Sequence, residues 1–399
     1  MTQFDERPGP SRRAWCANVL SWLAGALCWR GTLRPAGAVL NEPTTESGPL
    51  IVRVMRPYDA ETPAKEFTSF LTPVHRLFVR SHFGPPPQEA VTEPGWKLTV
   101  GGLVDRPQTF SMKTLRDLPT AKVTAILQCS GNGRAYHRPK VPGVQWERGA
   151  VGNVQWTGVR LRDVLAAAGV RPQAKHVQFQ GADRPVVTAV PLFIRSIPLG
   201  KALHPDTLLA YEMNGRPLPL LHGAPLRVVT PGWMAESSIK WLTDITLRAD
   251  EARGYYMQTA YRLPVTEIQS HSGLPGTSMV PVEVMVVKSL IAAPEDGAAI
   301  GRGPATIQGV AWSGDVPVVK VEVSFDDGKT WEAAQFVGEE EPYAWRRWQL
   351  IWKPTVTGPM TITCRATDAD GQSQPQVTPW NPSGFLWNGW DRITVTVEG

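Results

Sequence analysis

A single cysteine, followed closely by two glycines and an arginine, is the group of residues in this sequence whose spacing could do chemistry. The stretch is Gln128-Cys129-Ser130-Gly131-Asn132-Gly133-Arg134, and it follows the apolar run 123–127, which predicts a buried strand. A thiolate is a soft metal ligand, glycines let the backbone approach a bulky ligand, and arginine binds oxyanions with a fork of donors. The stretch therefore predicts a metal site that handles an anion. The competing interpretation is an inert, buried cysteine before an ordinary turn.

The composition is that of a globular protein large enough for two or three domains. Of its 399 residues, 42% are hydrophobic and 19% are charged, and the net charge of +5 is not gathered into a run of Lys and Arg. We therefore expect no binding of nucleic acid, whereas a mildly basic chain suits a small anionic substrate. The four cysteines, which are Cys16, Cys28, Cys129 and Cys364, form no CxxC pair, haem-attachment motif or zinc pattern.

Residues 1–38 have the features of an export signal. Arg12-Arg13 precedes the apolar stretch 14–29, and Ala36-Gly37-Ala38 resembles a signal-peptidase site. Together they predict a Tat-type signal, which exports proteins already folded and suits a cofactor inserted in the cytoplasm. The apolar stretch is short for a membrane span, so we expect a periplasmic or otherwise exported protein without stable membrane insertion after cleavage. A basic N-terminal membrane anchor is the alternative.

The rest of the sequence divides into three parts by composition and strand pattern. Residues 39–75 are rich in Pro and Glu and are expected to form an extended arm. Residues 76–270 mix short strands, such as Leu77–Gly84, with short helices, such as a capped helix at 111–118, and predict an α+β domain. Residues 271–399 contain short β-rich runs separated by turn signals, which predicts an all-β, immunoglobulin-like sandwich.

One expected helix runs from Thr157 to Leu165 and is closed by Gly169.

Several motifs after residue 75 resemble, in their order and spacing, those of the sulfite oxidase family of molybdenum enzymes, specifically the haem-free bacterial sulfite dehydrogenases. Besides the Cys129 stretch, these motifs are Arg80-Ser81-His82, 214–219, 222–227, Pro231-Gly232-Trp233 and Lys240-Trp241-Leu242. Each motif alone is weak, but the whole set is highly specific. The resemblance implies a mixed α+β molybdopterin-binding domain, then an immunoglobulin-like dimerisation domain, and hence a homodimer.

The resemblance also implies roles for individual side chains. Cys129 would be the thiolate ligand of molybdenum, and Arg80, Arg134 and Tyr261 would form the substrate pocket. The residues expected to hold the pterin and its phosphate are Ser81, His82, Phe83, Asp183, His222, Arg227, Ser238, Ile239 and Lys240. Taken alone, Tyr261 also fits an ordinary half-buried tyrosine, and the pair His222 and Arg227 fits a surface turn.

The activity implied is oxidation of sulfite to sulfate by oxygen-atom transfer at a Cys-ligated molybdopterin centre. Because the sequence contains no cytochrome b5-type domain and no haem-attachment motif, we expect no haem and an external electron acceptor. An exported c-type cytochrome is the candidate acceptor, and direct oxidation by oxygen is the competing possibility. Sulfane dehydrogenase or nitrate reductase chemistry on the same fold, and a non-catalytic exported binding protein, are the alternative functions.

One departure from the family concerns a further pocket arginine, which its members carry a few residues after a Trp-Asn pair. Here Trp380-Asn381 is followed by no arginine until Arg392, which precedes an alternating strand and is expected on a solvated face. Arg346 and Arg347 lie in another loop, and nothing in the sequence aims them at the pocket. We therefore expect Arg80 and Arg134 to carry most of the anion binding.

Overall fold

The computed structural model describes residues 50–267 and 278–399. Contacts divide the chain into two units, Met1–Glu46 and Ser47–Gly399, and the following description concerns the second. The predicted export signal and the first residues of the predicted arm lie outside the described residues. No helix within the described ranges is long and apolar enough to cross a membrane.

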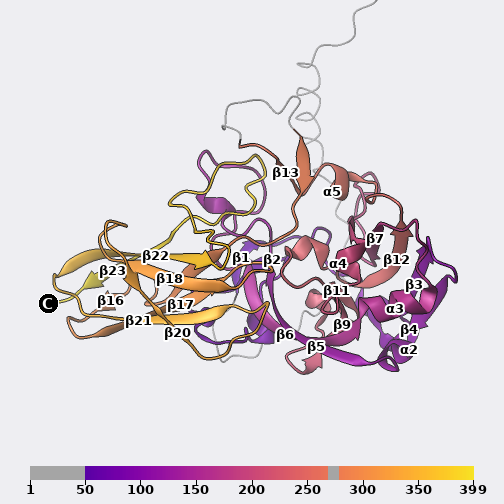
Figure 1. The fold of residues 1–399 in the computed structure, drawn as a ribbon, viewed down its shortest axis with the longest axis horizontal. Coiled ribbons are helices and arrows are strands. Elements are labelled where there is room, and N and C mark those ends of the chain that lie inside the picture. Colours follow the sequence, from indigo (N-terminus) through magenta and orange to yellow (C-terminus); the bar gives the residue numbers. More distant parts are fainter. Residues whose placement is uncertain (1–49, 268–277) are drawn as a thin grey trace, which may run out of the picture. The chain divides into compact units, whose positions relative to one another are not determined.

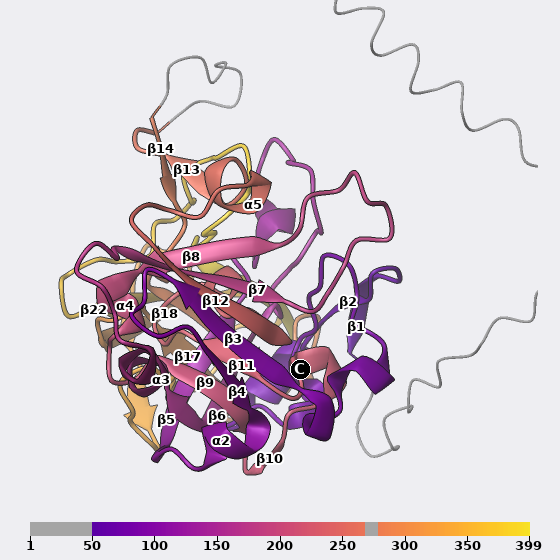
Figure 2. The same cartoon turned by 90° about the vertical axis from the view of Figure 1, so that its right-hand side faces the viewer.

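Two sheets form the framework of the first part of the described chain (Figures 1 and 2). The first sheet contains β5 (Thr120–Gln128), β6 (Val151–Arg160), β9 (Leu208–Met213), β10 (Arg216–Pro217) and β11 (Arg227–Val229). The second contains β3 (Lys97–Gly102), β4 (Gln108–Ser111), β7 (His176–Gly181), β8 (Ile194–Pro198) and β12 (Leu242–Arg248). Their strand orders are β10-β9-β6-β5, with β11 paired to β9, and β4-β3-β12-β7-β8. Strand β12 pairs parallel to β3 and antiparallel to β7, so the second sheet is mixed.

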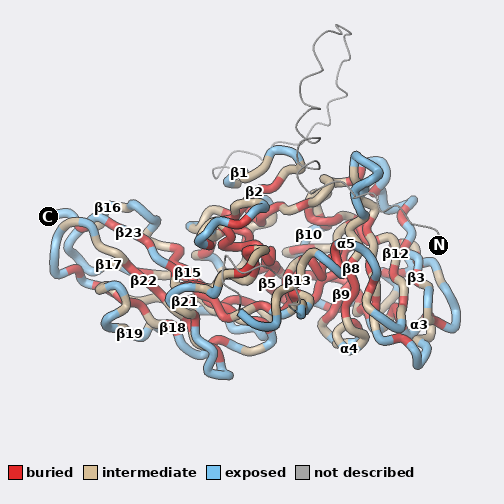
Figure 3. Tube along the Cα trace, turned by 90° about the horizontal axis from the view of Figure 1, so that it is seen from above, coloured by how far each residue is buried: buried red, intermediate tan, exposed pale blue. Residues whose placement is uncertain are grey.

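Strand β5 carries the Cys129 stretch into the interior. Its first residues alternate between exposed and buried, but every residue from Thr124 to Gln128 is buried (Figure 3). Ala125 and Leu127 pack into one hydrophobic cluster and Ile126 into another, so both faces of the strand are covered at its carboxyl end. The backbone that presents Cys129 is therefore held on both sides, as an apolar run of this length predicts.

The helices are short and are set by local signals. They are α2 (Met112–Arg116), α3 (Leu161–Ala168), α4 (Leu199–Ala202) and α5 (Tyr255–Gln258). Ser111 caps α2, as predicted, by accepting a hydrogen bond from the Thr114 N–H. Helix α3 ends at Gly169 (φ 73°), as predicted, but it begins later than expected because 157–160 continue strand β6 against β5 and β9.

Turns of 3₁₀ helix occupy several connections. They are η1 (Ala64–Thr68), η2 (Val74–Arg76), η3 (Gln88–Val91), η4 (Glu93–Gly95), η5 (Arg134–Tyr136), η6 (Leu220–His222) and η7 (Ala235–Ser237).

The described part of the predicted arm, from residue 50 onward, is folded rather than extended. Strands β1 (Ile51–Val54) and β2 (Asp59–Glu61) form an antiparallel pair. Phe67 is fully buried and packs edge-on against Trp345, with ring centroids 5.4 Å apart. The Pro- and Glu-rich composition concealed the few side chains that anchor this segment in the interior.

Residues 77–84, which the sequence predicts as a strand, form mostly irregular structure. One isolated bridge joins Val79 to Ala60. Beyond it, backbone groups pair with side chains: the Ser81 N–H donates to Asp59 Oδ1 (2.9 Å), and the Arg80 carbonyl accepts from Lys240 Nζ (2.9 Å). Side chains from distant segments thus replace the hydrogen bonds of a sheet.

The second part of the chain is all β, as predicted (Figure 1). One sheet has the order β15-β17-β21-β20 and the other β16-β23-β22-β18-β19. The strands are β15 (Lys288–Ala293), β16 (Ala299–Ile300), β17 (Ala305–Trp312), β18 (Val318–Ser324), β19 (Glu332–Ala333), β20 (Gln335–Val337), β21 (Arg346–Trp352), β22 (Gly358–Asp368) and β23 (Asp391–Val397). A common core that includes Ile307, Val321, Trp348 and Ile362 joins the two sheets into a sandwich. A short pair, β13 (Arg262–Pro264) and β14 (Met279–Pro281), precedes the sandwich in the sequence.

Candidate functional site

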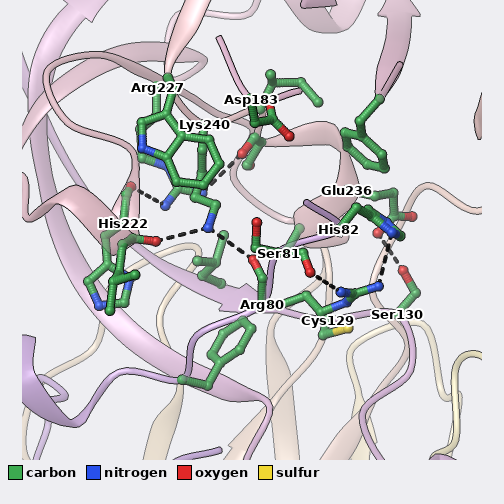
Figure 4. A pocket seen from close by; sticks show the side chains of 18 of the residues that line it. Arg80, Ser81, His82, Cys129, Ser130, Asp183, His222, Arg227, Glu236 and Lys240 are labelled. Atoms are coloured by element: carbon green, nitrogen blue, oxygen red, sulfur yellow. Dashed lines mark hydrogen bonds between the residues drawn. The ribbon is translucent and has the colours of Figure 1, made fainter. Parts of the chain in front are cut away.

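A cavity lies where β5 ends, and most of the predicted site residues line it (Figure 4). The predicted residues in its wall are Arg80, Ser81, His82, Cys129, Asp183, His222, Arg227, Ser238, Ile239, Lys240 and Tyr261. The wall also contains residues that the sequence did not single out, namely Phe78, Leu127, Ser130, Phe193, Leu221, Ala235, Glu236 and Trp241. Two predicted residues, Phe83 and Arg134, are not part of the wall. Phe83 packs against the His82 ring, with centroids 6.1 Å apart, and Arg134 is held by backbone carbonyls.

Basic side chains gather at one end of the cavity (Figure 4). Arg227 donates to the carbonyls of His222 (2.9 Å) and Ser238 (3.0 Å), and Lys240 donates to those of Arg80 and Leu221 (both 2.9 Å). Burial lowers the pKa of Arg227 to about 9, and burial together with the repulsion of Arg227 lowers the pKa of Lys240 to about 7. Desolvated cations fit an anionic group such as a phosphate, whose charge would offset the cost of their burial.

The thiol of Cys129 faces the other end of the cavity. Cys129 is a free cysteine with 8% of its surface exposed, and its N–H donates to the Ala150 carbonyl (2.9 Å). Burial raises the pKa of the thiol, while the charges of Arg80 and Arg134 favour the thiolate. A soft anion that the protein has already desolvated gains from binding a metal ion, because the ion supplies the charge that burial removes.

Arg80 is fixed by an acidic partner that the sequence did not reveal. Its Nη1 pairs with Asp59 Oδ2 (3.1 Å), and Asp59 is 1% exposed. Its Nη2 donates to His82 Nδ1 (3.1 Å), so the other ring nitrogen, Nε2, carries the hydrogen and donates to the Tyr261 hydroxyl oxygen (2.8 Å). A series of hydrogen bonds therefore orders the polar groups next to Cys129, and it runs from Asp59 through Arg80 and His82 to Tyr261.

The C-terminal sandwich contributes the segment 381–387 to this region. Phe385 stacks on Tyr261, with ring centroids 5.2 Å apart and planes 5° apart, and the Arg134 guanidinium lies 5.2 Å from the same ring. Arg134 Nε also donates to the Ser383 carbonyl (3.0 Å), and the Leu386 N–H donates to the Ser130 carbonyl (3.0 Å). An aromatic ring thus stands in the segment where the family's further arginine was expected.

The two glycines of the Cys129 stretch make room for protein side chains. A Cβ at Gly131 would lie 2.7 Å from the Arg134 guanidinium, and one at Gly133 (φ 92°) would lie 2.6 Å from the Trp387 ring. The close approach predicted from these glycines is therefore real, although the groups that approach belong to the chain itself.

The other arginines considered for the pocket lie elsewhere. Both Arg346 and Arg347 lie on β21. Arg346 pairs with Glu340 (2.7 Å), and Arg347 pairs with Glu339 (2.8 Å). Arg392, on β23, is 3.6 Å from Asp327 Oδ1 and keeps 36% of its side chain exposed, in agreement with the expected solvated face.

Glu236 is the most informative residue that sequence reasoning missed. It is 7% exposed, lies in the cavity wall, and its Oε2 accepts a short hydrogen bond from the Ser130 hydroxyl. Burial raises the pKa of Glu236 to about 7. The available signal was its position two residues before the segment 238–240, which was expected to complete the pocket.

Comparisons with known proteins agree with this arrangement. The family model for an oxidoreductase molybdopterin binding domain matches residues 83–256, and that for a Mo-co oxidoreductase dimerisation domain matches residues 280–398. Mitochondrial sulfite oxidase of Mus musculus is 36% identical over 366 residues, which cover 87% of this chain and 66% of that protein. Sulfite oxidase of Arabidopsis thaliana is 33% identical over 374 residues, which cover 87% of this chain and 93% of that protein.

A solved structure shows the same fold. The sulfane dehydrogenase SoxCD from Paracoccus pantotrophus superposes with a TM-score of 0.74 at 25% identity, covering 98% of this chain and 100% of that one.

Proposed function

Because this chain belongs to the sulfite oxidase family of molybdopterin enzymes, we propose that it oxidises sulfite to sulfate at a Cys129-ligated molybdopterin centre and passes the electrons to an external acceptor. The observation that carries the proposal is one cavity with a free thiol at one end and desolvated cations at the other. The mouse relative is longer than this chain, which spans 66% of its length.

The residues of the cavity fit a molybdopterin. Arg227, Lys240 and His222 would hold its phosphate, Asp183 would bind the pterin, and Cys129 would ligate the metal. When bound, this group supplies a metal that can take up two electrons as an oxygen atom is transferred. The chain itself would do the rest: it binds the anion, orients it and excludes water.

Arg80 and Tyr261 are the groups best placed to orient the substrate. Arg80 lines the cavity as a permanent cation, and its attachment to Asp59 keeps the guanidinium from turning away. Tyr261 is partly buried, and desolvation raises the pKa of its hydroxyl, so the hydroxyl stays protonated near neutral pH and can donate a hydrogen bond. Phe385 stacks on the Tyr261 ring and so covers one of its faces.

Metal analysis tests the proposal directly. Protein made in a host that synthesises the cofactor should contain about one molybdenum per chain and should reduce an added acceptor when sulfite is supplied. Protein without molybdenum would support the exported binding protein instead. Molybdenum with turnover of a sulfane substrate and none of sulfite would support the sulfane dehydrogenase alternative, which the SoxCD likeness favours.

Lys240→Met is expected to lower the molybdopterin content by about tenfold or more, because a charge-assisted hydrogen bond to a phosphate is worth roughly 1.5–3 kcal/mol. The measurement is molybdenum and pterin content after gel filtration. Lys113→Met is the matched control, because Lys113 is exposed on α2 and pairs with Asp117. Equal cofactor content in the two variants would contradict a phosphate site at Lys240, provided that both melt within a few degrees of the parent protein.

The sandwich is proposed to hold a homodimer, as the match to a dimerisation domain supports. Multi-angle light scattering at micromolar concentration is expected to give a mass near twice that of the chain. A monomer at that concentration would count against the dimer.

A c-type cytochrome acceptor and Tat-dependent export remain parts of the proposal. Fractionation of cells with and without a working Tat system tests the export, and a comparison of cytochrome c with oxygen as oxidant tests the acceptor.

A further inference from the structure

One oxygen of the buried Glu236 carboxyl group has no partner within the described structure. Glu236 Oε2 is bound by the Ser130 hydroxyl, whereas Oε1 is buried and has no hydrogen-bond partner among the described residues. Leaving such an atom unpaired is unfavourable, because it has lost its hydrogen bonds to water and gained none in return. Figure 4 shows this carboxyl group on the same side of the cavity as Cys129, Arg80 and His82. Oε1 is therefore available for a group that enters the cavity.

The charges around Glu236 do not neutralise it. Arg195 of β8 attracts it, but the Arg195 guanidinium donates to the Tyr256 carbonyl (2.7 Å), and the nearby Glu283 repels it. Three other neighbours face the Glu236 carboxyl group. The Ser130 hydroxyl donates a hydrogen bond to it, and its negative charge acts on the Cys129 thiol and on the Tyr261 hydroxyl. Because burial dominates, the pKa of Glu236 rises to about 7.

An anionic substrate would meet this carboxyl group in a desolvated space. Arg80, the guanidinium in the cavity wall at that end, is already balanced by Asp59, and Arg134 is bound to the carbonyls of Ser383 and Val144. Two negative groups side by side in such a space repel each other strongly, and the usual solution is that they share a proton.

We propose that the substrate oxoanion binds together with one proton, which lies between an oxygen of the oxoanion and Glu236 Oε1. The proton comes from solvent or arrives on the oxoanion, and no other bond is made or broken. The inference rests on the proposed function, and it defines the substrate class as oxoanions that bind in a singly protonated complex. Glu236 is then a substrate-binding residue that selects for the proton.

Sulfate is a suitable probe, because it carries no titrating proton near neutral pH. Binding of sulfate to the purified holoprotein, measured by calorimetry between pH 6 and 8.5, is expected to be constant below the pKa of Glu236. Above that value the affinity should fall by about tenfold per pH unit, since a proton must be taken up. Repeating the titration in buffers of different ionisation enthalpy should show the uptake of about one proton at pH 8.

Glu236→Gln should remove this dependence, because the amide N–H donates permanently to the oxoanion. Its sulfate affinity should be flat with pH and should involve no proton uptake. Glu283→Gln is the matched control, because it removes a neighbouring negative charge from outside the cavity wall. That variant should keep the parent's proton uptake.

Absence of sulfate binding, or binding by the parent protein without proton uptake, overturns the inference even if the glutamine variant fails to fold. Failure of the proposed function looks different, since it would appear as missing molybdenum or missing sulfite turnover.

Discussion

Cys129→Ser is expected to abolish sulfite oxidation and to leave the chain folded with its pterin still bound. The hydroxyl of serine is a hard and weakly acidic ligand in place of a soft thiolate, so the proposed metal centre would lose its protein ligand. The pterin should remain, because the basic residues that would hold its phosphate belong to other segments. Sulfite-dependent reduction of an artificial acceptor, with pterin content measured on the same sample, gives the result.

Cys364→Ser is the control for this substitution. Cys364 is the other free cysteine among the described residues and is buried in the sandwich core, 3.2 Å from the Ser289 hydroxyl. Its replacement should leave turnover intact, with some loss of thermal stability. Normal turnover by Cys129→Ser would end the assignment of Cys129 as the metal ligand.

Arg80→Ala and Arg134→Ala are each expected to lower kcat/KM for sulfite roughly 30- to 150-fold. This factor corresponds to a loss of about 2–3 kcal/mol of transition-state stabilisation. The two losses should have different causes. Arg80→Ala removes a cation from the cavity wall and also leaves Asp59 buried without its partner. Arg134→Ala removes the guanidinium packed on Phe385. The substrate would then lose a positive charge near its site, and the Phe385 ring would lose a group that holds it in place.

Steady-state kinetics of Arg346→Ala and Arg392→Ala supply the comparison, since both arginines pair with carboxylates on the sandwich. They should behave like the parent protein. Adding Asp59→Asn to Arg80→Ala should restore folding stability without restoring kcat/KM, which separates the structural cost from the loss of the anion contact. A large defect at Arg346 or Arg392, combined with a mild one at Arg80, would overturn this map of the pocket.

The sequence predicted those parts of the fold and of the site that depend on local pattern. A few consecutive residues are enough to predict each of three features. These are the capped helix at Ser111, the end of α3 at Gly169 and the buried strand before Cys129. Most of the predicted lining residues do line one cavity, because the motifs that carry them occur in the order and spacing of a known fold.

The residues that were missed depend on contacts between distant segments. Asp59 is 21 positions from Arg80 and lies in a segment whose composition predicts an extended arm. Glu236 is 106 positions from Ser130, and an isolated glutamate in a sequence usually indicates a solvated surface. Arg134 was placed in the pocket by the family resemblance, and its carbonyl partners at Val144 and Ser383 could not be seen in a linear pattern.

The contacts on either side of Cys129 bear on how this protein could be engineered. Gln128 accepts a hydrogen bond from Trp312 Nε1 (2.7 Å), and the Ser130 carbonyl accepts one from the Leu386 N–H (3.0 Å). Both neighbours of the cysteine are therefore hydrogen-bonded to residues of the C-terminal half. A chimera that received its C-terminal half from a relative would therefore also receive that relative's contacts to the residues on either side of Cys129, together with its proposed subunit interface. Exchanging the C-terminal half is a route to altering anion preference without touching a residue of the molybdopterin domain.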